Sequence, residues 1–252
     1  MRIRNIKIKE NIDLSFDNEF AENYFKVFSA TVVPFESFFI RSLASFNAKE
    51  DSTLSEFILQ ELNHSKMHND LNKRIFNSHA DNYFFKLFTF EIGRYISKID
   101  FENKGKLEII SVVGAFEYFT LITSVFFVLN NYGKRHLNKD LYELMRYHSL
   151  EEIEHRHVCE ELYLKNGGGI VRYIISVLKY STLSLIYILY QTHKIMSAKK
   201  IKPYVFWINL FKFLIVDGKF VFLFAKLLIK RMSPFYRIKN DSFYNELIDI
   251  KN

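Results

Sequence analysis

Apolar residues recur every three to four positions along most of the chain, which is the periodicity of α-helices that bury one face. This pattern predicts seven helices, at residues 18–47, 51–76, 80–101, 105–130, 136–165, 170–197 and 203–231. Asp51 is the expected N-cap of the second helix. The run Asn166-Gly167-Gly168-Gly169 is the one strong flexible break between helices.

The composition supports an all-α protein. The chain has 252 residues, of which 49% are hydrophobic, so it is long enough to bury a full core. Its 8 Gly and 3 Pro are too few to turn the many strands of a β-sandwich or barrel of this length. Cys159 is the only cysteine, which excludes internal disulfides and cysteine-based metal sites, and we expect it in the core.

Residues 109–130 form the most apolar segment, with Glu117 as its only charge. Two interpretations compete. The segment is long enough to span a bilayer with a functional carboxylate. It is equally suited to be the central helix of a soluble bundle, apolar on all sides because neighbours surround it. The amphipathic, charged helices predicted on either side of it favour the bundle.

The net charge of +7 is unevenly distributed. Residues 1–164 contain 20 Lys and Arg against 24 Asp and Glu, whereas residues 165–252 contain 15 against 4. The sign changes at the triple glycine. This predicts two parts, an acidic helical bundle at residues 1–166 and a basic, apolar helical tail at residues 170–252.

Two glutamates stand in apolar surroundings. Glu36 lies among Phe35, Phe38 and Phe39, and Glu117 lies in the apolar helix described above. An ionised carboxylate buried without partners costs several kcal/mol or becomes protonated. Either residue taken alone is most simply a core glutamate paired with Arg or Tyr, and Glu91 is a similar decoy.

Two of the predicted helices carry residues at metal-ligand spacing. Glu61, His64 and His68 occupy positions i, i+3 and i+7, so their side chains leave one helix face. The predicted helix 136–165 repeats this arrangement with His148, Glu151, Glu152 and His155. Glu154 and His157 point away from that face.

The order of these residues is more informative than each motif alone. A lone glutamate alternates with Glu-x-x-His twice along the chain, giving Glu36, Glu61 with His64, Glu117, and Glu152 with His155. Ferritin-like four-helix bundles hold two iron or manganese ions with this ligand set. Two divalent cations would also neutralise four carboxylates that otherwise repel one another in an apolar core. The alternative is a set of buried ion pairs in a plain bundle.

Two further histidines and one further glutamate extend the same faces. His68 and His148 each lie one turn from a Glu-x-x-His pair, so they are candidates for additional ligands, for orienting a carboxylate or for moving protons. We favour the last two roles over direct ligation. Glu151 is a candidate to bind a ligand histidine or a basic residue.

At these residues the chain resembles the bacterial family of predicted metal-dependent hydrolases, which has a ferritin-like helical fold. The resemblance rests on PFESFF at Pro34–Phe39, FILQELNHSKMH at Phe57–His68, AFEYFT at Ala115–Thr120 and YHSLEEIEHRHV at Tyr147–Val158. It covers most of residues 25–165, and the tail is similar only in being apolar and basic. Tyr147 replaces a tryptophan of the family pattern, and Phe35 stands where glycine is common. Neither departure removes a proposed ligand.

The resemblance implies a metal-dependent enzyme with a ferritin-like four-helix core and an additional C-terminal apolar helical pair. Hydrolysis would use a water molecule activated by the metals. Oxidation or hydroxylation by dioxygen is the alternative reaction, because four glutamates and two histidines are closer to the di-iron oxygenases. The aromatic surroundings predict an apolar small-molecule substrate, and the metals are expected to be iron, then manganese. A metal-storing or structural bundle is the alternative from another class.

The tail alternates apolar runs with single lysines, and its longest uncharged runs, about 14 residues, are short for a membrane span. It suits helices that lie on a bilayer, with Trp207 at the interface. Packing on the bundle or forming a homodimer is the equal alternative, and nucleic acid is excluded as a partner because no binding motif is present. The single cysteine and the absence of a signal-peptide stretch predict the cytoplasm, at the inner face of the membrane if the tail binds lipid.

Overall fold

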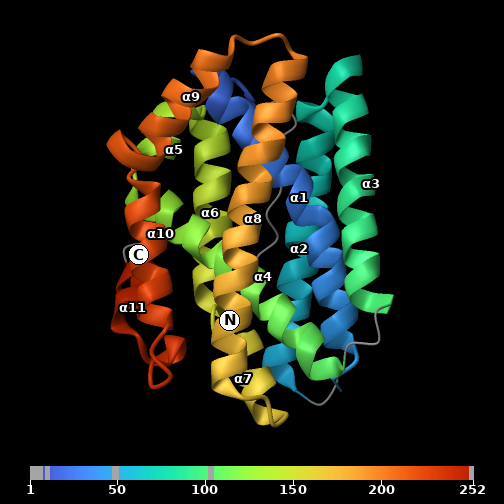
Figure 1. The fold of residues 1–252 in the computed structure, drawn as a ribbon, viewed down its shortest axis with the longest axis vertical. Helices are drawn as coiled ribbons and strands as arrows, with labels where there is room; N and C mark the ends of the chain where they lie inside the picture. Colours follow the sequence, from blue (N-terminus) through green and yellow to red (C-terminus); the bar gives the residue numbers. More distant parts are fainter. Residues whose placement is uncertain (1–7, 9–11, 47–50, 102–104, 250–252) are drawn as a thin grey trace.

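The computed structural model describes residues 8, 12–46, 51–101 and 105–249, which form helices and connecting loops without a β-strand (Figure 1). One isolated bridge joins Phe16 to Leu137. The predicted all-α class is therefore confirmed.

The first four helices match the prediction to within a few residues. They are α1 (Glu19–Ala44), α2 (Ser52–Ile75), α3 (His79–Phe101) and α4 (Lys106–Leu129). Asp51 caps α2 as predicted, since its carboxylate accepts a hydrogen bond from the N–H of Leu54 at 3.2 Å. The predicted end of the first helix at residue 47 lies outside the described residues.

The single helix predicted at residues 136–165 is wrong. The structure has α5 (Tyr132–His136), α6 (Lys139–His155) and α7 (Val158–Lys165) in its place. The break after α6 follows from a side chain: Arg156 Nη1 donates to the carbonyl of Ile153 at 2.8 Å. A continuous helix would pair that carbonyl with the N–H of His157.

The C-terminal part begins with α8 (Ile170–Ala198), directly after the triple glycine, so the predicted break is confirmed. The single helix predicted at 203–231 is wrong. It is divided into α9 (Pro203–Phe211), the π-helical turn η1 (Lys212–Val216) and α10 (Phe220–Arg231). A Cβ on Gly218 would collide with the carbonyl oxygen of Phe213, so the turn requires glycine there. The 3-10 turn η2 (Ile238–Asn240) and α11 (Ser242–Asp249) follow and were not predicted.

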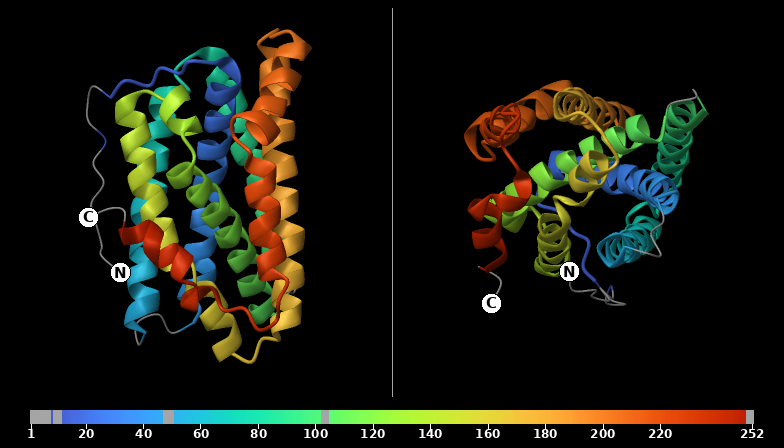
Figure 2. Two further views of the ribbon diagram at one scale, coloured as in Figure 1. Left: turned by 90° about the vertical axis from the view of Figure 1, so that its left-hand side faces the viewer. Right: turned by 90° about the horizontal axis from the view of Figure 1, so that it is seen from below.

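The long helices form three layers. Seen from below, α1 and α4 lie in the middle, with α8 on one side and α2 and α6 on the other (Figure 2). The helices α4 and α8 approach each other closely at Gly114. A Cβ on this residue would collide with the ring of Tyr173 on α8. Because α4 has neighbours on both sides, its all-round apolar surface is buried, as the bundle interpretation expects.

Three helices, α1, α4 and α8, are long and apolar enough to cross a membrane when judged by length and composition alone. They differ in burial. The most apolar stretch of α4 is 72% buried inside the structure, whereas that of α8 is only 33% buried. Much of the apolar surface of α8 therefore faces outward.

The helix α8 packs along both α4 and α1, so the first helix of the basic tail shares a core with the acidic part of the chain. Ser181 Oγ donates to the carbonyl of Ala115 in this interface, at 3.1 Å. The division into domains at 1–166 and 170–252 stays a prediction.

Candidate metal centre

The helix α2 brings three predicted residues to one buried face. Glu61, His64 and His68 are each no more than 1% exposed. Their spacing of three and seven residues places them one above the other on a helix of 3.6 residues per turn. The prediction that they share a face is consistent with this burial.

The helix α6 supplies the second set. His148, Glu151, Glu152 and His155 are all buried, and they lie on the side of α6 that packs toward α2 and α4. His155 is the last residue of α6, because the helix ends where Arg156 takes up the carbonyl of Ile153. The position of this imidazole therefore depends on how the helix ends.

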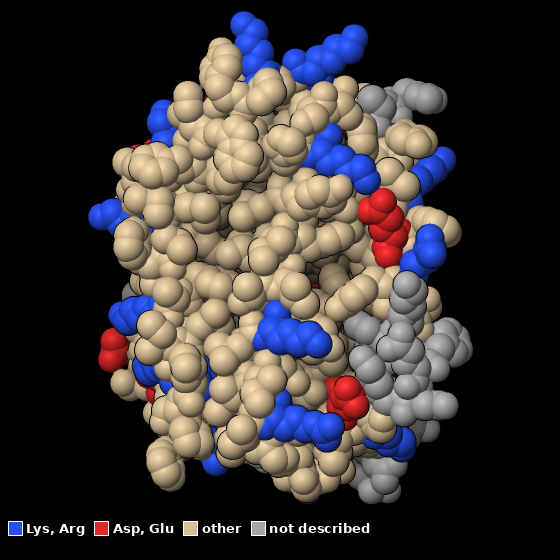
Figure 3. Space-filling model, in the orientation of Figure 1, with Lys and Arg blue, Asp and Glu red and all other residues tan. Residues whose placement is uncertain are grey.

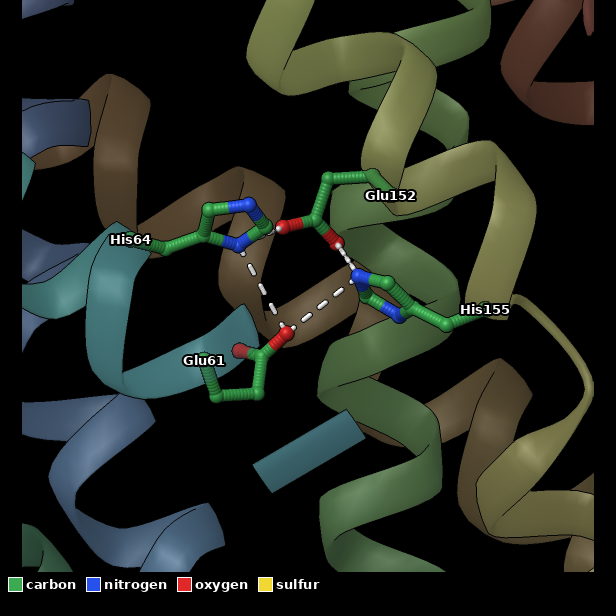
Figure 4. A group of neighbouring side chains, drawn as sticks. All are labelled: Glu61, His64, Glu152 and His155. Carbon is green, nitrogen blue, oxygen red and sulfur yellow. Dashed lines mark ion pairs between the residues drawn. The ribbon is translucent and has the colours of Figure 1, made fainter. Parts of the chain in front are cut away.

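Four of these side chains meet in a compact cluster (Figure 4). One ligand-type atom from each of Glu61, His64, Glu152 and His155 lies within 4.8 Å of the others. Glu61 Oε1 lies 3.6 Å from His64 Nδ1 and 3.3 Å from His155 Nε2. Glu152 bridges the other side, with Oε1 3.1 Å from His64 Nδ1 and Oε2 3.8 Å from His155 Nε2. Two carboxylates and two imidazoles thus surround one point in the core.

The two lone glutamates approach this cluster from the other helices. Glu117 of α4 lies with Oε2 3.5 Å from Nδ1 of His155. Glu36 of α1 is 3% exposed and, like Glu117, lines the cavity that also reaches Glu61 and Glu152. Neither belongs to the compact group of four. The fold nevertheless brings all four glutamates of the predicted set into one region.

Three of these four buried carboxylates have raised pKa values. Burial and the neighbouring Glu61 carboxylate raise the pKa of Glu36 well above its usual value. Burial, Glu117 and Glu152 raise the pKa of Glu61 to about 7. Burial and Glu152 raise the pKa of Glu117 in the same way. The site therefore has more negative charge than the protein itself balances.

The imidazole of His64 is the main positive partner within the cluster. Burial lowers its pKa, but contacts with Glu151, Glu152 and Glu61 outweigh burial and raise the pKa well above its usual value. Burial raises the pKa of Glu152, but the attraction of His155 and His64 outweighs burial and lowers that pKa. Protonated His64 thus partly compensates the carboxylates when no metal is bound.

Three further side chains support the cluster. Glu151 Oε2 accepts from Nε2 of His64 at 3.2 Å, on the side of the ring away from Glu61 and Glu152. This position fits the predicted role of Glu151 in binding a ligand histidine. Thr120 Oγ1 donates to Glu152 Oε2 at 3.1 Å. The sequence analysis did not predict a role for Thr120. Its position three residues after Glu117, on the same helix face, could have indicated one.

His148 and His68 lie beyond the cluster. His148 Nε2 is 3.5 Å from Glu152 Oε1, and this histidine also lines the cavity. His68 instead hydrogen-bonds Ser29 Oγ through Nδ1 at 2.9 Å. Burial lowers the pKa of both imidazoles, that of His68 to about 3. Neither belongs to the compact group of four.

The Glu, His and Cys residues that we did not propose as metal ligands lie outside the cluster. Glu91 pairs with Gln191 Nε2 at 2.8 Å and with Lys194 Nζ at 3.3 Å, at the surface end of the cavity. His157 lies 4.0 Å from Glu161, outside the cluster. Cys159 is buried, and burial raises its thiol pKa, as expected for a core residue.

A cavity of about 390 Å³ leads from the carboxylates to the surface between α3 and α8. Its inner end is lined by the glutamates and His148. Its middle is largely aromatic, with Phe35, Phe116 and Tyr180 among the lining residues. Its outer end is lined by side chains that are also exposed, including Leu183 and Tyr190. An apolar molecule thus has a path to the cluster.

Together, these features define an all-helical protein with a buried Glu and His cluster of metal-ligating composition at the end of an apolar cavity. The chain belongs to the family described as predicted metal-dependent hydrolase, whose model matches residues 2–239. The match extends beyond residue 165, so the C-terminal helices through α10 are part of the family's chain. No curated protein and no solved structure matches this sequence.

Proposed function

We propose that this protein is an enzyme that binds two divalent metal ions and acts on an apolar small molecule. The proposed ligands are Glu36, Glu61, His64, Glu117, Glu152 and His155, held by α1, α2, α4 and α6 in a ferritin-like arrangement. The observation that carries the proposal is the convergence of four buried carboxylates, of which Glu61, Glu117 and Glu152 form ion pairs with histidines and, among the described residues, with no Lys or Arg.

Unsatisfied buried atoms support a fit to metal. Within the described part of the chain, Glu36 Oε2, Glu61 Oε1 and Glu117 Oε1 have no hydrogen-bond partner. The same holds for His64 Nδ1 and for both ring nitrogens of His155. Buried polar atoms are rarely left unsatisfied, and imidazole nitrogens with carboxylate oxygens are ligands that iron and manganese accept. Bound cations would satisfy the carboxylate oxygens and one nitrogen of each imidazole.

The protein's own residues would prepare the site for chemistry. Divalent cations held there would supply a water molecule of lowered pKa for hydrolysis or, as iron(II), electrons for oxidation by dioxygen. Glu151 orients His64 by accepting from its outer nitrogen, and Thr120 fixes Glu152. His148 faces both Glu152 and the cavity, so it is the candidate for moving a proton between them. His68, held by Ser29, supports the ring of His148 at a centroid distance of 5.0 Å.

Hydrolysis is the reaction that the family description favours. A second candidate, oxidation of an apolar substrate by dioxygen, is favoured by the aromatic lining of the cavity and by the four-glutamate, two-histidine ligand set. Oxygen consumption by the iron(II) form distinguishes the two. Turnover under anaerobic conditions supports hydrolysis, whereas turnover coupled to oxygen uptake supports oxidation.

The cavity also argues for an enzyme over a storage or structural bundle, because a path of this kind serves a substrate larger than an ion. Binding of an apolar fluorescent probe to the metal-loaded protein tests this point. The larger side chain of Phe35→Trp should fill part of the cavity, so the variant is expected to bind the probe more weakly than the wild type. A probe that binds equally to both proteins contradicts it.

Metal analysis tests the proposed ligands directly. Protein produced with iron supplied is expected to contain about two metal ions per chain. Glu117→Gln is expected to lose at least one ion, because it removes a ligand oxygen and a charge. Glu91→Gln is the matched control, since Glu91 lines the same cavity but is paired with Gln191 and Lys194. Full metal content in Glu117→Gln, or equal loss in both variants, contradicts the proposal.

A further inference from the structure

Exposed apolar side chains are concentrated on one side of the molecule. Among the residues that the structure describes, 21 large hydrophobic residues are exposed, and 15 of them lie between Val171 and Phe235, in about a quarter of the chain. Three more, including Phe90 and Tyr95, lie on the neighbouring α3. We call the outward side of α3, α8, α9 and α10 the apolar face. Contiguous exposed apolar surface of this kind marks an interaction site.

The helix α8 provides the centre of this face. Ile175, Leu183, Ile186 and Tyr190 are between 46% and 59% exposed. Their successive spacings of eight, three and four residues place them in one stripe along the helix. The opposite side of α8, which includes Val177 and Ile188, packs on the core. The helix is therefore apolar on both sides, and only one side is covered by the protein.

The cavity opens through this stripe. Leu183, Ile186 and Tyr190 of α8 line its outer end, and Tyr95 of α3 lines the opposite edge. All four are more than 40% exposed, so they belong to the cavity and to the apolar face at once. The same face is hollowed near its centre in the space-filling view (Figure 3). A molecule entering the cavity must cross this apolar surface.

Lysines predominate among the charges on the apolar face. Exposed lysines lie among or beside its apolar residues at Lys179, Lys200, Lys202, Lys212, Lys219 and Lys226. The sequence from residue 166 to residue 216 contains no Asp or Glu. In this view Lys and Arg lie on the face and around its edges, and acidic groups are few (Figure 3). The face is complementary to an apolar surface that carries negative charge.

We propose that the apolar face docks on an anionic phospholipid bilayer, with the mouth of the cavity against the lipid. Lysines reach the headgroups while the apolar side chains enter the upper part of the acyl region. The substrate class is then a lipophilic molecule that enters the cavity from the bilayer without crossing water. The docking rests on the surface alone, whereas this route for the substrate rests on the proposed function.

A second copy of the chain is a poorer occupant of the same face. In a symmetric dimer the same patch meets itself, so lysines of one copy would face lysines of the other. No acidic residue of α8 or α9 is available to pair with them. The lysine within the stripe, Lys179, also favours a surface position over a full membrane span for α8.

Trp207 provides the probe for a vesicle-binding experiment. It is the only tryptophan, it lies on α9 and it is 60% exposed. The metal-free full chain is mixed with vesicles of phosphatidylcholine alone or of equal parts phosphatidylcholine and phosphatidylglycerol. Binding to the anionic vesicles, a blue shift of Trp207 emission and quenching by brominated lipid are expected. Affinity for neutral vesicles should be at least about tenfold lower.

Variants of the two components of the face complete the test. Ile186→Asp is expected to weaken binding to anionic vesicles at least about tenfold, and so is Lys200→Glu combined with Lys202→Glu. Leu59→Asp is the control, because Leu59 is 41% exposed on α2, on the far side of the molecule. Circular dichroism and metal content establish that each variant folds.

Three outcomes overturn the docking proposal. They are no binding to anionic vesicles, equal binding of the control and the Ile186→Asp variant, and a concentration-dependent dimer that shields Trp207 without lipid. Failure of the metal site would leave vesicle binding unchanged, since the metal-free chain is used. Failure of the docking would likewise leave metal content unchanged, so the two proposals fail separately.

Discussion

Two groups of buried charges occupy the same bundle, and they are balanced in opposite ways. In the first, Lys26 Nζ lies 3.0 Å from Asp81 Oδ2 and 2.7 Å from Glu22 Oε1. Lys199 Nζ lies 3.0 Å from Asp81 Oδ1, so two ammonium groups meet two carboxylates. In the second group, the only ion-pair partners of Glu61, Glu117 and Glu152 among the described residues are imidazoles.

The pKa shifts follow from this difference. Burial raises the pKa of Asp81, but the contacts with Lys199 and Lys26 outweigh burial and lower that pKa. Burial raises the pKa of Glu61, and the neighbouring carboxylates raise it further, to about 7. A carboxylate buried with its own cation is complete within the protein. A carboxylate buried among others either keeps its proton or is balanced by a cation from outside.

The largest expected effect is on the balanced group. Asp81→Asn leaves Lys26 buried with only Glu22 as a close partner, which should reduce the free energy of unfolding by about 3 kcal/mol. Urea denaturation with an unchanged m-value measures this loss. Glu22→Gln is the comparison, because Glu22 is about one-third exposed and its loss should cost much less. Equal loss in the two variants would show that burial does not decide the outcome.

The next effect is on metal affinity. Glu151→Gln removes the negative charge of the group that accepts the hydrogen bond from Nε2 of His64. The affinity for iron(II) should therefore fall about tenfold, while the metal content at saturation is retained. Competition with a chelator of known affinity measures the change. The control is Glu154→Gln, since Glu154 is partly exposed on the same helix and outside the compact cluster. An unchanged affinity in Glu151→Gln would remove Glu151 from the site.

A smaller effect of opposite sign is expected without metal. Glu117→Gln removes one member of the repelling carboxylates, so the metal-free protein should gain about 1 kcal/mol of stability. Thermal unfolding measured in the presence of a chelator tests this change. Added metal should stabilise the wild type more than the variant. A loss of stability in the metal-free variant would show that Glu117 is satisfied within the protein.

The smallest effect is on pH dependence. Unfolded glutamates have lost their protons well below pH 6.5, whereas folded Glu61 releases its proton at about 7. The folded metal-free protein thus binds more protons than the unfolded chain, and the contribution of Glu61 to its stability should fall by less than about 1 kcal/mol from pH 6.5 to 8. The raised pKa of His64 acts in the same direction. The lowered pKa values of His68 and His148 oppose it between about pH 5.5 and 7.5, where unfolded histidines titrate.

Metal should reverse this pH dependence. Protons compete with cations for the same oxygens, so the stabilisation by metal should grow as the pH rises through 7. Thermal unfolding with and without manganese at pH 6.5, 7.2 and 8 provides the comparison. A metal effect that is constant across this range would contradict the assignment of Glu61 as a ligand.

The fold could be predicted where local signals decide it. Helical periodicity, the Asp51 cap and the triple glycine each act within a few residues, and the structure agrees with them. The break after His155 has no such signal, because neither glycine nor proline stands there and the cause is the side chain of Arg156. The turn at Gly218 did have a signal, a glycine after Asp217, that the helical pattern around it outweighed.

The site was predictable to the extent that helix periodicity places side chains on one face. Spacing alone indicated that His64 and His155 would point inward from their helices. It did not reveal which nitrogen of each ring faces a carboxylate, or that Thr120 would donate to Glu152, because these contacts depend on how separate helices pack. Spacing also could not predict the pairing of Glu91 with Gln191, since the two residues lie 100 positions apart.

Arg156 links the end of α6 to the C-terminal segment. Beyond the carbonyl of Ile153, its guanidinium reaches Asn245 Oδ1 at 2.8 Å and lies over the ring of Tyr244 at 5.1 Å. The residue immediately before it is His155. The last helix of the chain therefore acts as an external brace on the geometry of a side chain in the core. A substitution that weakens the packing of α11 would therefore change the position of the His155 imidazole without altering any residue that surrounds it.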